Sequence, residues 1–333
     1  MNKIKMIFLL IIFTFSTSAM ALTIKIGSIA PAKSPWDKAL RQMAREWKTI
    51  SGGSVKIKIY PGGIAGSEKD MIRKMKIGIL GGAVFSNRGL TKIYSDFYVL
   101  NIPFIFNNNK EFLYVVDKMN PIFERKIGAK GYKVIIWSMA GWVHLFGKKP
   151  LIYPKDLKKL KLSFATGEPE LEQAWRKSGF QVIPNELKDM LMALQSGMVS
   201  AFYLPPLVAA SGQYFPLSPY MNPLKIAPVY GGIVLTNKVW NRIPENLKIK
   251  FGQTAKRLAS DLYRKANELE LEAVKTMKAN GLKIPKVPEN ATILWRQSAQ
   301  KGMDLLINKV FSESIYKKMI GYLNEYRKSE KKQ

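Results

Sequence analysis

A stretch in the middle of the chain, residues 155–206, restricts the possible folds more than any other part of the sequence. It begins with the segment Lys-Asp-Leu-Lys-Lys-Leu-Lys-Leu-Ser-Phe-Ala (155–165), which supplies the first strand, and a helical pattern follows at 168–178. A short apolar strand at 180–183 comes next, and a second helix and strand lie within 190–206, with Gly or Pro at the joints. Strands that alternate with helices form a parallel sheet covered by helices. The stretch therefore predicts an α/β fold.

The ends of these strands are the first place to look for a binding site. In open α/β sheets, ligands bind at the carboxyl ends of the strands. The residues at those ends are Ser163 and Phe164 on one strand, and Phe202, Tyr203 and Leu204 on another. We expect these mostly apolar residues to line a pocket.

The same stretch resembles the solute receptor of tripartite ATP-independent periplasmic (TRAP) transporters, the DctP-type family. The family shows a Pro-x-Asp-Leu-x-Gly-Leu-Lys-Ile-Arg segment, followed by Ala-Leu-Gln-x-Gly-x-Val-Asp-Gly-x-Glu-x-Pro. Residues 237–244 also match its Asn-x-x-Trp-x-x-Leu-Pro pattern closely. The residues that match the first two patterns are Pro154, Asp156, Leu157, Leu160, Lys161, Ala193, Leu194, Gln195, Gly197, Val199 and Pro205.

The resemblance implies a periplasmic-binding-protein-like fold (type II), with two lobes, a cleft between them and a long helix that spans both. Apolar residues recur every three or four positions through 245–280, which at ~1.5 Å per residue is a helix of roughly 50 Å. We expect 22–142 and 231–280 to form lobe I, and 143–230 and 281–333 to form lobe II. Domain closure over a solute is the implied mechanism.

The residues that would bind an anion in this family are replaced here. The family's ligand-clamping Arg aligns with Ser163, the Arg of its Gly-Phe-Arg-His segment aligns with Val143, and its Glu aligns with Tyr203. A buried carboxylate without a guanidinium partner costs several kcal/mol. We therefore predict an apolar cleft for a largely hydrophobic solute, which Ser163, Tyr203 and His144 or Asn87 would orient. The predicted ligand-binding residues are Trp36, Phe85, Asn87, Trp142, Val143, His144, Ser163, Phe164, Phe202, Tyr203 and Leu204.

Two other functions remain open. In the first, the solute is an organic acid of the dicarboxylate type, bound by Arg73, Arg88 or Lys92 of lobe I. In the second, the chain is a scaffold whose basic exterior binds anionic lipid or polymer. The 53 Lys and Arg residues outnumber the 24 Asp and Glu residues, for a net charge of +29. They are spread along the chain without interleaved aromatic residues, so we expect a solvated surface and no nucleic-acid partner. We interpret 327–333 as a frayed, charged end.

Catalysis is not expected. His144 is the only histidine and the chain has no cysteine, so a zinc site would consist almost wholly of carboxylates, which zinc seldom accepts. No Gly-x-Ser-x-Gly segment supplies a nucleophile for a triad. Glu268, Glu270 and Glu272 lie on the predicted long helix, and we interpret the face that Glu268 and Glu272 share with Lys265 and Lys275 as a solvated, salt-bridged edge and not as a paired-carboxylate site. The sequence thus predicts no enzyme, no metal and no cofactor.

The first 21 residues have the pattern of a secretory signal peptide. Lys3 and Lys5 precede an apolar run at 6–15, and Ala19 to Ala21 forms a small-residue cleavage signature. The apolar run is shorter than the ~20 residues of a membrane span. We expect cleavage after Ala21 and a periplasmic protein. The resemblance implies TRAP membrane permease subunits as partners of the receptor, and a periplasmic TPR-repeat protein as a second partner, because some relatives without the Arg clamp have one.

Overall fold

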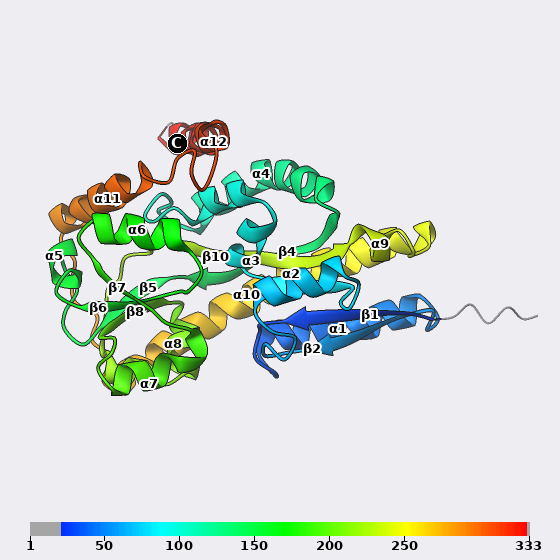
Figure 1. Cartoon of the computed structure of the whole chain (residues 1–333), viewed down its shortest axis with the longest axis horizontal. Helices are drawn as coiled ribbons and strands as arrows, with labels where there is room; N and C mark the ends of the chain where they lie inside the picture. Colours follow the sequence, from blue (N-terminus) through cyan, green and yellow to red (C-terminus); the bar gives the residue numbers. More distant parts are fainter. Residues whose placement is uncertain (1–20, 332–333) are drawn as a thin grey trace, which may run out of the picture.

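The computed structural model describes residues 21–331, so nearly all of the predicted signal peptide lies outside the described residues. Two five-stranded sheets lie next to each other along the long axis of the molecule, and helices cover them (Figure 1). This two-lobed α/β arrangement confirms the predicted fold class. No helix within 21–331 is both long and apolar enough to cross a membrane.

The first sheet is mixed. β1 pairs in parallel with β2 and β3, whereas β10 runs antiparallel to both β3 and β4. In β1 the apolar Leu22, Ile24 and Ile26 are buried and alternate with the exposed Thr23 and Lys25, as expected for a strand with one buried face. In spatial order the strands are β2 (Val55–Tyr60), β1 (Leu22–Ser28), β3 (Gly82–Phe85), β10 (Pro228–Thr236) and β4 (Tyr132–Trp142).

The second sheet contains the strands predicted within 155–206. β6 runs parallel to β7 and β8, and β5 runs antiparallel to β8 and β9. The helices α6 (Pro169–Lys177) and α7 (Met190–Gln195) lie between these strands in the sequence, as predicted. In spatial order the strands are β7 (Gln181–Pro184), β6 (Lys161–Phe164), β8 (Ala201–Leu204), β5 (His144–Gly147) and β9 (Tyr220–Met221).

The chain crosses between the two sheets at two neighbouring places. β4 ends at Trp142 and β5 begins at His144, so Val143 alone connects the two sheets at the first crossing. The second crossing is the segment before β10. The N–H of Val143 donates to the carbonyl of Ala227 at 2.9 Å, and the N–H of Ile226 donates to the carbonyl of Val143 at 3.0 Å. The two connections are therefore hydrogen-bonded to each other.

Several helices pack against the first sheet. α1 begins at Pro35, and its N-cap is Ser34, whose hydroxyl accepts a hydrogen bond from the Asp37 N–H. Its apolar face is buried, and Trp47 stacks on Phe251 with a centroid distance of 4.1 Å. The elements are α1 (Pro35–Ile50), α2 (Glu68–Lys76), α3 (Asn87–Ile93), the 3-10 helix η1 (Ser95–Asn101), α4 (Asn109–Ala129) and α9 (Asn237–Trp240).

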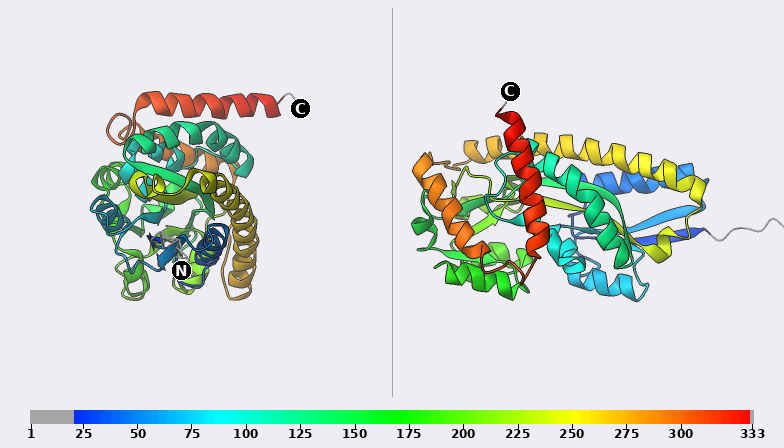
Figure 2. Two further views of the ribbon diagram at one scale, coloured as in Figure 1. Left: turned by 90° about the vertical axis from the view of Figure 1, so that its right-hand side faces the viewer. Right: turned by 90° about the horizontal axis from the view of Figure 1, so that it is seen from above.

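A single long helix, α10 (Glu245–Ala279), runs along both halves of the molecule (Figure 2). It packs on α1 and β4 beside the first sheet and on α8 (Pro206–Ser211) beside the second. The predicted helix that spans both lobes is therefore present.

The last two helices contact different halves. α11 (Glu289–Met303) packs on α6 and on the short helix α5 (Pro154–Leu157), whereas α12 (Glu313–Glu330) lies across α4 and η1 (Figure 2). The predicted division assigns α12 to lobe II, but the elements that it packs on belong to the part assigned to lobe I. Two further 3-10 helices, η2 (Leu187–Asp189) and η3 (Phe215–Leu217), lie in the second half.

The interpretation of 327–333 as a frayed end is wrong for its first residues. Arg327 lies inside α12, and its guanidinium forms two hydrogen bonds to the carboxylate of Glu111 on α4, each 2.9 Å long. Glu111 is 4% exposed, and such a buried carboxylate requires a charged partner.

Candidate ligand-binding cleft

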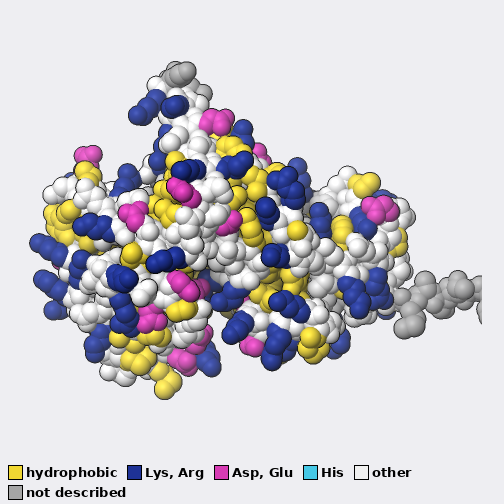
Figure 3. Space-filling view, turned by 45° about the horizontal axis from the view of Figure 1, so that its top comes forward, with side chains coloured by type: hydrophobic (Ala, Val, Ile, Leu, Met, Phe, Trp, Pro, Cys, Tyr) yellow, Lys and Arg dark blue, Asp and Glu magenta, His cyan; other side chains and the backbone are white. Residues whose placement is uncertain are grey.

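A cavity of about 670 Å³ lies between the two sheets. α1, α3, β4 and β10 form its wall on the side of the first sheet, and β6, β8 and α8 form the opposite wall; residues 258–262 of α10 contribute as well. The surface is indented between the two halves in the space-filling view (Figure 3). The volume of the cavity is typical of small-molecule sites, which usually measure roughly 300–1,000 Å³.

Eight of the eleven predicted site residues line this cavity. They come from five separate parts of the chain, which the fold brings together around the cleft. These residues are Trp36, Phe85, Asn87, Val143, Ser163, Phe164, Tyr203 and Leu204.

Phe202 does not line the cleft. Successive side chains of a strand point to opposite faces of the sheet, so Phe202 lies on the other side from Tyr203. Its ring stacks on Phe146 with a centroid distance of 4.8 Å, and both rings are fully buried. The residue belongs to the core of the second half.

Trp142 and His144 are also outside the lining. The indole N–H of Trp142 donates to the side-chain oxygen of Asn109, and the amine of Lys225 lies 5.3 Å from the ring centroid. Nδ1 of His144 lies 3.1 Å from the backbone oxygen of Asn222. Burial lowers the pKa of His144 to about 4, so the ring is neutral at physiological pH. Trp142 and His144 therefore stabilise the connection between the two sheets, on either side of Val143.

The cleft wall also contains two polar side chains that the sequence did not point to, Asn185 and Ser138. Nδ2 of Asn185 donates to Oγ of Ser163 at 3.2 Å, and both residues are buried. The hydroxyl of Ser138 and the indole nitrogen of Trp36 are buried without a hydrogen-bond partner. Such groups lose their hydrogen bonds with water on burial, and a polar atom of a ligand would satisfy them.

Ser138 could have been found from the strand pattern. Within β4, Ile136 and Ala140 also line the cleft, and the three residues alternate with side chains on the other face. The alternation of this strand therefore places Ser138 on the same face as Ile136. To identify Ser138 as a site residue, one would also have to know which face of β4 lines the cavity.

Arg88 is the one arginine among the lining residues. Nε donates to Oε1 of Glu168 at 2.9 Å, and Nη2 donates to the backbone oxygen of Thr166 at 3.2 Å. Arg88 belongs to α3 beside the first sheet, whereas Thr166 and Glu168 lie in the loop after β6 of the second sheet. This contact therefore joins the two walls of the cleft.

The other two cations proposed for an organic-acid site lie elsewhere. Arg73 is on α2, where Nη2 is 3.5 Å from Oδ1 of Asp70 and most of the side chain is exposed. Nζ of Lys92 is 3.5 Å from the backbone oxygen of Gly167, outside the lining.

Glu68 fixes the start of α3 and so the position of Arg88. Its carboxylate accepts hydrogen bonds from the N–H of Ser86 at 2.6 Å and from the Ser86 hydroxyl at 3.1 Å. Burial raises the pKa of Glu68, although these hydrogen bonds and the charge of Arg88 act in the opposite direction. Ser86 in turn caps α3 by accepting from the Arg88 N–H.

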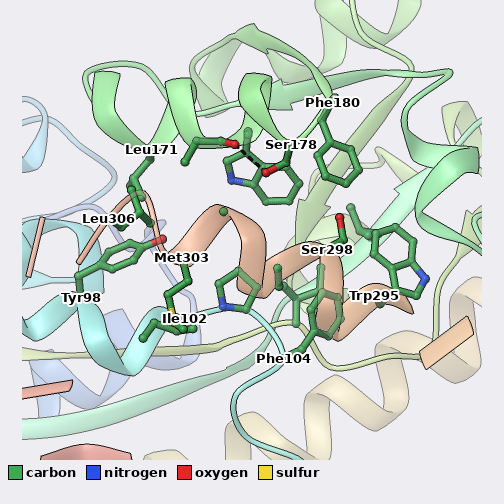
Figure 4. Close-up of a pocket in the computed structure, with 17 residues that line it drawn as sticks. Tyr98, Ile102, Phe104, Leu171, Ser178, Phe180, Trp295, Ser298, Met303 and Leu306 are labelled. Atoms are coloured by element: carbon green, nitrogen blue, oxygen red, sulfur yellow. Dashed lines mark hydrogen bonds between the residues drawn. The ribbon is translucent and has the colours of Figure 1, made fainter. Parts of the chain in front are cut away.

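A smaller cavity of about 50 Å³ lies behind the cleft, between α6 and α11 (Figure 4). Trp295, Phe104 and Phe180 line it, together with the hydroxyl-bearing Ser298 and Ser178. It shares part of its wall with the cleft, so the two spaces are separated by single side chains. The shared residues are Tyr98, Pro103, Leu171, Trp175 and Ile226.

The residues that line the cleft suit the binding of a small molecule. Its charged residues are Lys33, Arg88 and Glu168, and most of the other side chains are apolar. Within 21–331, no group of three or more His, Cys, Asp or Glu side chains could hold a metal ion.

Comparisons with known proteins agree with this picture. The family model of DctP, described as bacterial extracellular solute-binding protein, family 7, matches residues 26–310. A solute-binding protein of Chromohalobacter salexigens is 23% identical over 293 residues, which cover 86% of this chain and 85% of the relative.

Two solved structures have the same fold. One is a TRAP periplasmic solute-binding protein from Desulfovibrio desulfuricans with bound sn-glycerol-3-phosphate (TM-score 0.83, 18% identity, covering 92% of this chain and 97% of that one). The other, from Roseobacter denitrificans with bound β-D-glucuronate, has a TM-score of 0.82 and 17% identity, and the match covers 90% of this chain and 98% of that one.

These matches confirm the TRAP receptor assignment, and they agree with the expectation that the chain is not an enzyme, because the family and its structural neighbours are solute-binding proteins. Family membership also places the protein in the periplasm, although residues 1–20, with the predicted signal peptide, lie outside the described part. The chain belongs to the DctP family of bacterial extracellular solute-binding proteins.

Proposed function

We propose that this receptor captures a small, largely apolar solute with a single polar head and delivers it to a TRAP membrane permease. The observation that carries the proposal is the composition of the cleft. Its one arginine is already paired with Glu168. Ser163 and Val143, which the sequence patterns described above align with arginines of the family, also line it. Such a wall favours burial of apolar surface, at roughly 25 cal/mol per Å².

The polar head would bind near the unpaired hydroxyl of Ser138 and the buried pair of Ser163 and Asn185. A few polar groups in an apolar wall orient a ligand without a net charge. The hydroxyl of Tyr203 is a further candidate, because burial raises its pKa and keeps it protonated as a hydrogen-bond donor.

Capture would occur by closure of the two halves about the crossings at Val143 and Ala227, with α10 as a common support. The closed form would then dock on the permease subunits. A periplasmic TPR-repeat protein is a second proposed partner.

Calorimetry with two probes tests the solute class. 1-Decanol represents an apolar solute with one polar head, and D-glucuronate represents a charged one. We expect the native protein to bind 1-decanol and not D-glucuronate. The double variant Val143→Arg/Ser163→Arg introduces arginines at the two family positions and should lose 1-decanol affinity. Failure of the native protein to bind 1-decanol would contradict the proposal.

A second candidate function is an organic-acid receptor that uses Arg88. Two observations favour it: Arg88 lines the cleft, and the two neighbours described above contain bound D-glucuronate and glycerol phosphate. In that case D-glucuronate would bind tightly to the native protein, and Arg88→Ala would abolish the binding. The basic-scaffold alternative has no comparable support from the site.

A further inference from the structure

One ion pair crosses the cleft, between Arg88 of α3 and Glu168 at the start of α6. The pair is partly shielded from water, since the Arg88 side chain is 38% exposed and that of Glu168 is 16% exposed. Its Nε–Oε1 distance of 2.9 Å is that of a charge-assisted hydrogen bond. It is a specific contact and not a chance approach of two mobile surface groups.

One two-donor edge of the guanidinium is already occupied. Nε donates to Glu168 and Nη2 to the backbone oxygen of Thr166. A solute carboxylate binds arginine best through two parallel N–H donors. An acid that enters the cleft would therefore have to displace Glu168 from this edge, or bind through the Nη1 edge with the negative charge of Glu168 close by.

We propose that Glu168 is a specificity-determining residue: an internal carboxylate that occupies the guanidinium of Arg88 and selects against acidic solutes. The proposal rests on the proposed function, and it explains how a receptor can keep an arginine in its cleft and still prefer uncharged cargo. Unfavourable placement of a like charge is a common means of discrimination between ligands.

The negative charges of Glu168 and Glu68 both disfavour an acid bound at Arg88. A displaced Glu168 would stay close to the bound acid, as an unpaired carboxylate in a partly buried position. Glu68 lies behind Arg88 and contributes negative potential to it. Lys92 approaches only the backbone oxygen of Gly167, so it does not offset the pair within the cleft. Lys33, the other cation of the lining, is exposed.

The test compares D-glucuronate binding by the native protein and by Glu168→Gln, which preserves the shape of the side chain and removes its charge. The matched control is Glu172→Gln on the same helix, because Glu172 pairs with Arg176 away from the cleft. The double variant Glu168→Gln/Arg88→Met shows whether any gain acts through the guanidinium. Circular dichroism and the Tm of each variant establish folding, and Glu168→Ala is a second variant if the glutamine form is unstable.

We expect D-glucuronate to bind Glu168→Gln at least about tenfold more tightly than the native protein, as is typical when a charge-assisted hydrogen bond is gained. The gain should disappear in the double variant and be absent from Glu172→Gln. Equal affinity of the native protein and Glu168→Gln would overturn the proposal, as would a gain that persists without Arg88. Binding of 1-decanol, measured in parallel, decides the proposed function independently, because that probe has no charge for Glu168 to repel.

Discussion

The backbone of Gly141 lies directly against the carboxylate of Glu270. A Cβ atom added to Gly141 would stand 1.8 Å from Oε2 of Glu270, and φ of this glycine is +99°. The N–H of the next residue, Trp142, donates to the same carboxylate. The end of β4, where the chain leaves the first sheet, is thereby fixed to the long helix α10.

Gly141→Ala should destabilise the protein strongly. The alanine would adopt a backbone conformation that costs about 1–3 kcal/mol, and its Cβ would displace Glu270. Urea denaturation measures the change in the free energy of unfolding. The matched control is Gly321→Ala in α12, where a Cβ meets no atom within 4 Å and alanine should stabilise by up to about 1 kcal/mol. Equal stability of Gly141→Ala and the native protein would refute the packing described for this crossing.

His144 and Glu270 should give stability opposite dependences on pH. The pKa of His144 falls from 6.5 to about 4 on burial, so the unfolded chain binds more protons between these values and stability decreases as the pH falls through them. Burial raises the pKa of Glu270 from 4.5 to about 7, despite its hydrogen bond from Trp142. The folded protein therefore binds more protons in that window, and stability decreases as the pH rises. Each effect amounts to about 3 kcal/mol.

The two effects partly cancel in the native protein, and single variants should reveal them. In Glu270→Gln, the urea midpoint should fall as the pH is lowered from 6.5 to 4, as His144 alone dictates. In His144→Gln, it should fall as the pH is raised from 4.5 to 7. The same pH profile in both variants would show that these groups do not control the stability.

Arg327 should stabilise the position of α12 on α4. Burial alone would raise the pKa of Glu111, but hydrogen bonds from Arg327 and Asn107 outweigh it and hold the pKa below its usual value. Arg327→Met would leave this carboxylate without its partner and should cost about 2 kcal/mol, less than a fully buried pair because Arg327 is 36% exposed. Thermal unfolding compares it with Arg264→Met, whose side chain is 74% exposed and which should change stability by less than about 0.5 kcal/mol. Similar losses in both variants would contradict the prediction.

Ser138→Ala should stabilise the ligand-free protein and weaken binding. The variant removes a buried hydroxyl without a partner, which should raise the free energy of unfolding by about 1 kcal/mol. A solute head that uses this hydroxyl would lose up to about tenfold in affinity. Calorimetry with 1-decanol measures the second effect, and Ser329→Ala, at an exposed helix end, is the control. Unchanged 1-decanol binding would exclude Ser138 from the site.

Regular patterns in the sequence predicted most of the fold. The alternation of strands and helices in 155–206 gave the order of β6, α6, β7, α7 and β8. The apolar repeat through 245–280 predicted the length of α10. A serine followed by proline, as at Ser34 and Pro35, is also a helix start that is visible in the sequence. Each of these features depends on neighbours within one or two turns, so it is visible without the tertiary structure.

Features that depend on contacts between distant segments of the chain could not be predicted from the sequence. Glu268 pairs with Lys265, as expected of an exposed edge. No pattern in the sequence indicates that Glu270, two positions later, is covered by Gly141 at the end of β4. Nothing near Arg88 in the sequence reveals that Glu168, eighty positions later, is its partner. Strand alternation places Phe202 outside the cleft, but only once it is known that Tyr203 faces the cleft.

The most direct test of the central claim is to identify the compound that accompanies the protein when it is purified from the periplasm. Native mass spectrometry gives the mass of the complex, and extraction with organic solvent separates apolar from charged ligands. The account predicts one bound molecule per chain that passes into the organic phase, and equal retention by Arg88→Ala. A water-soluble acid that is lost from Arg88→Ala would contradict it.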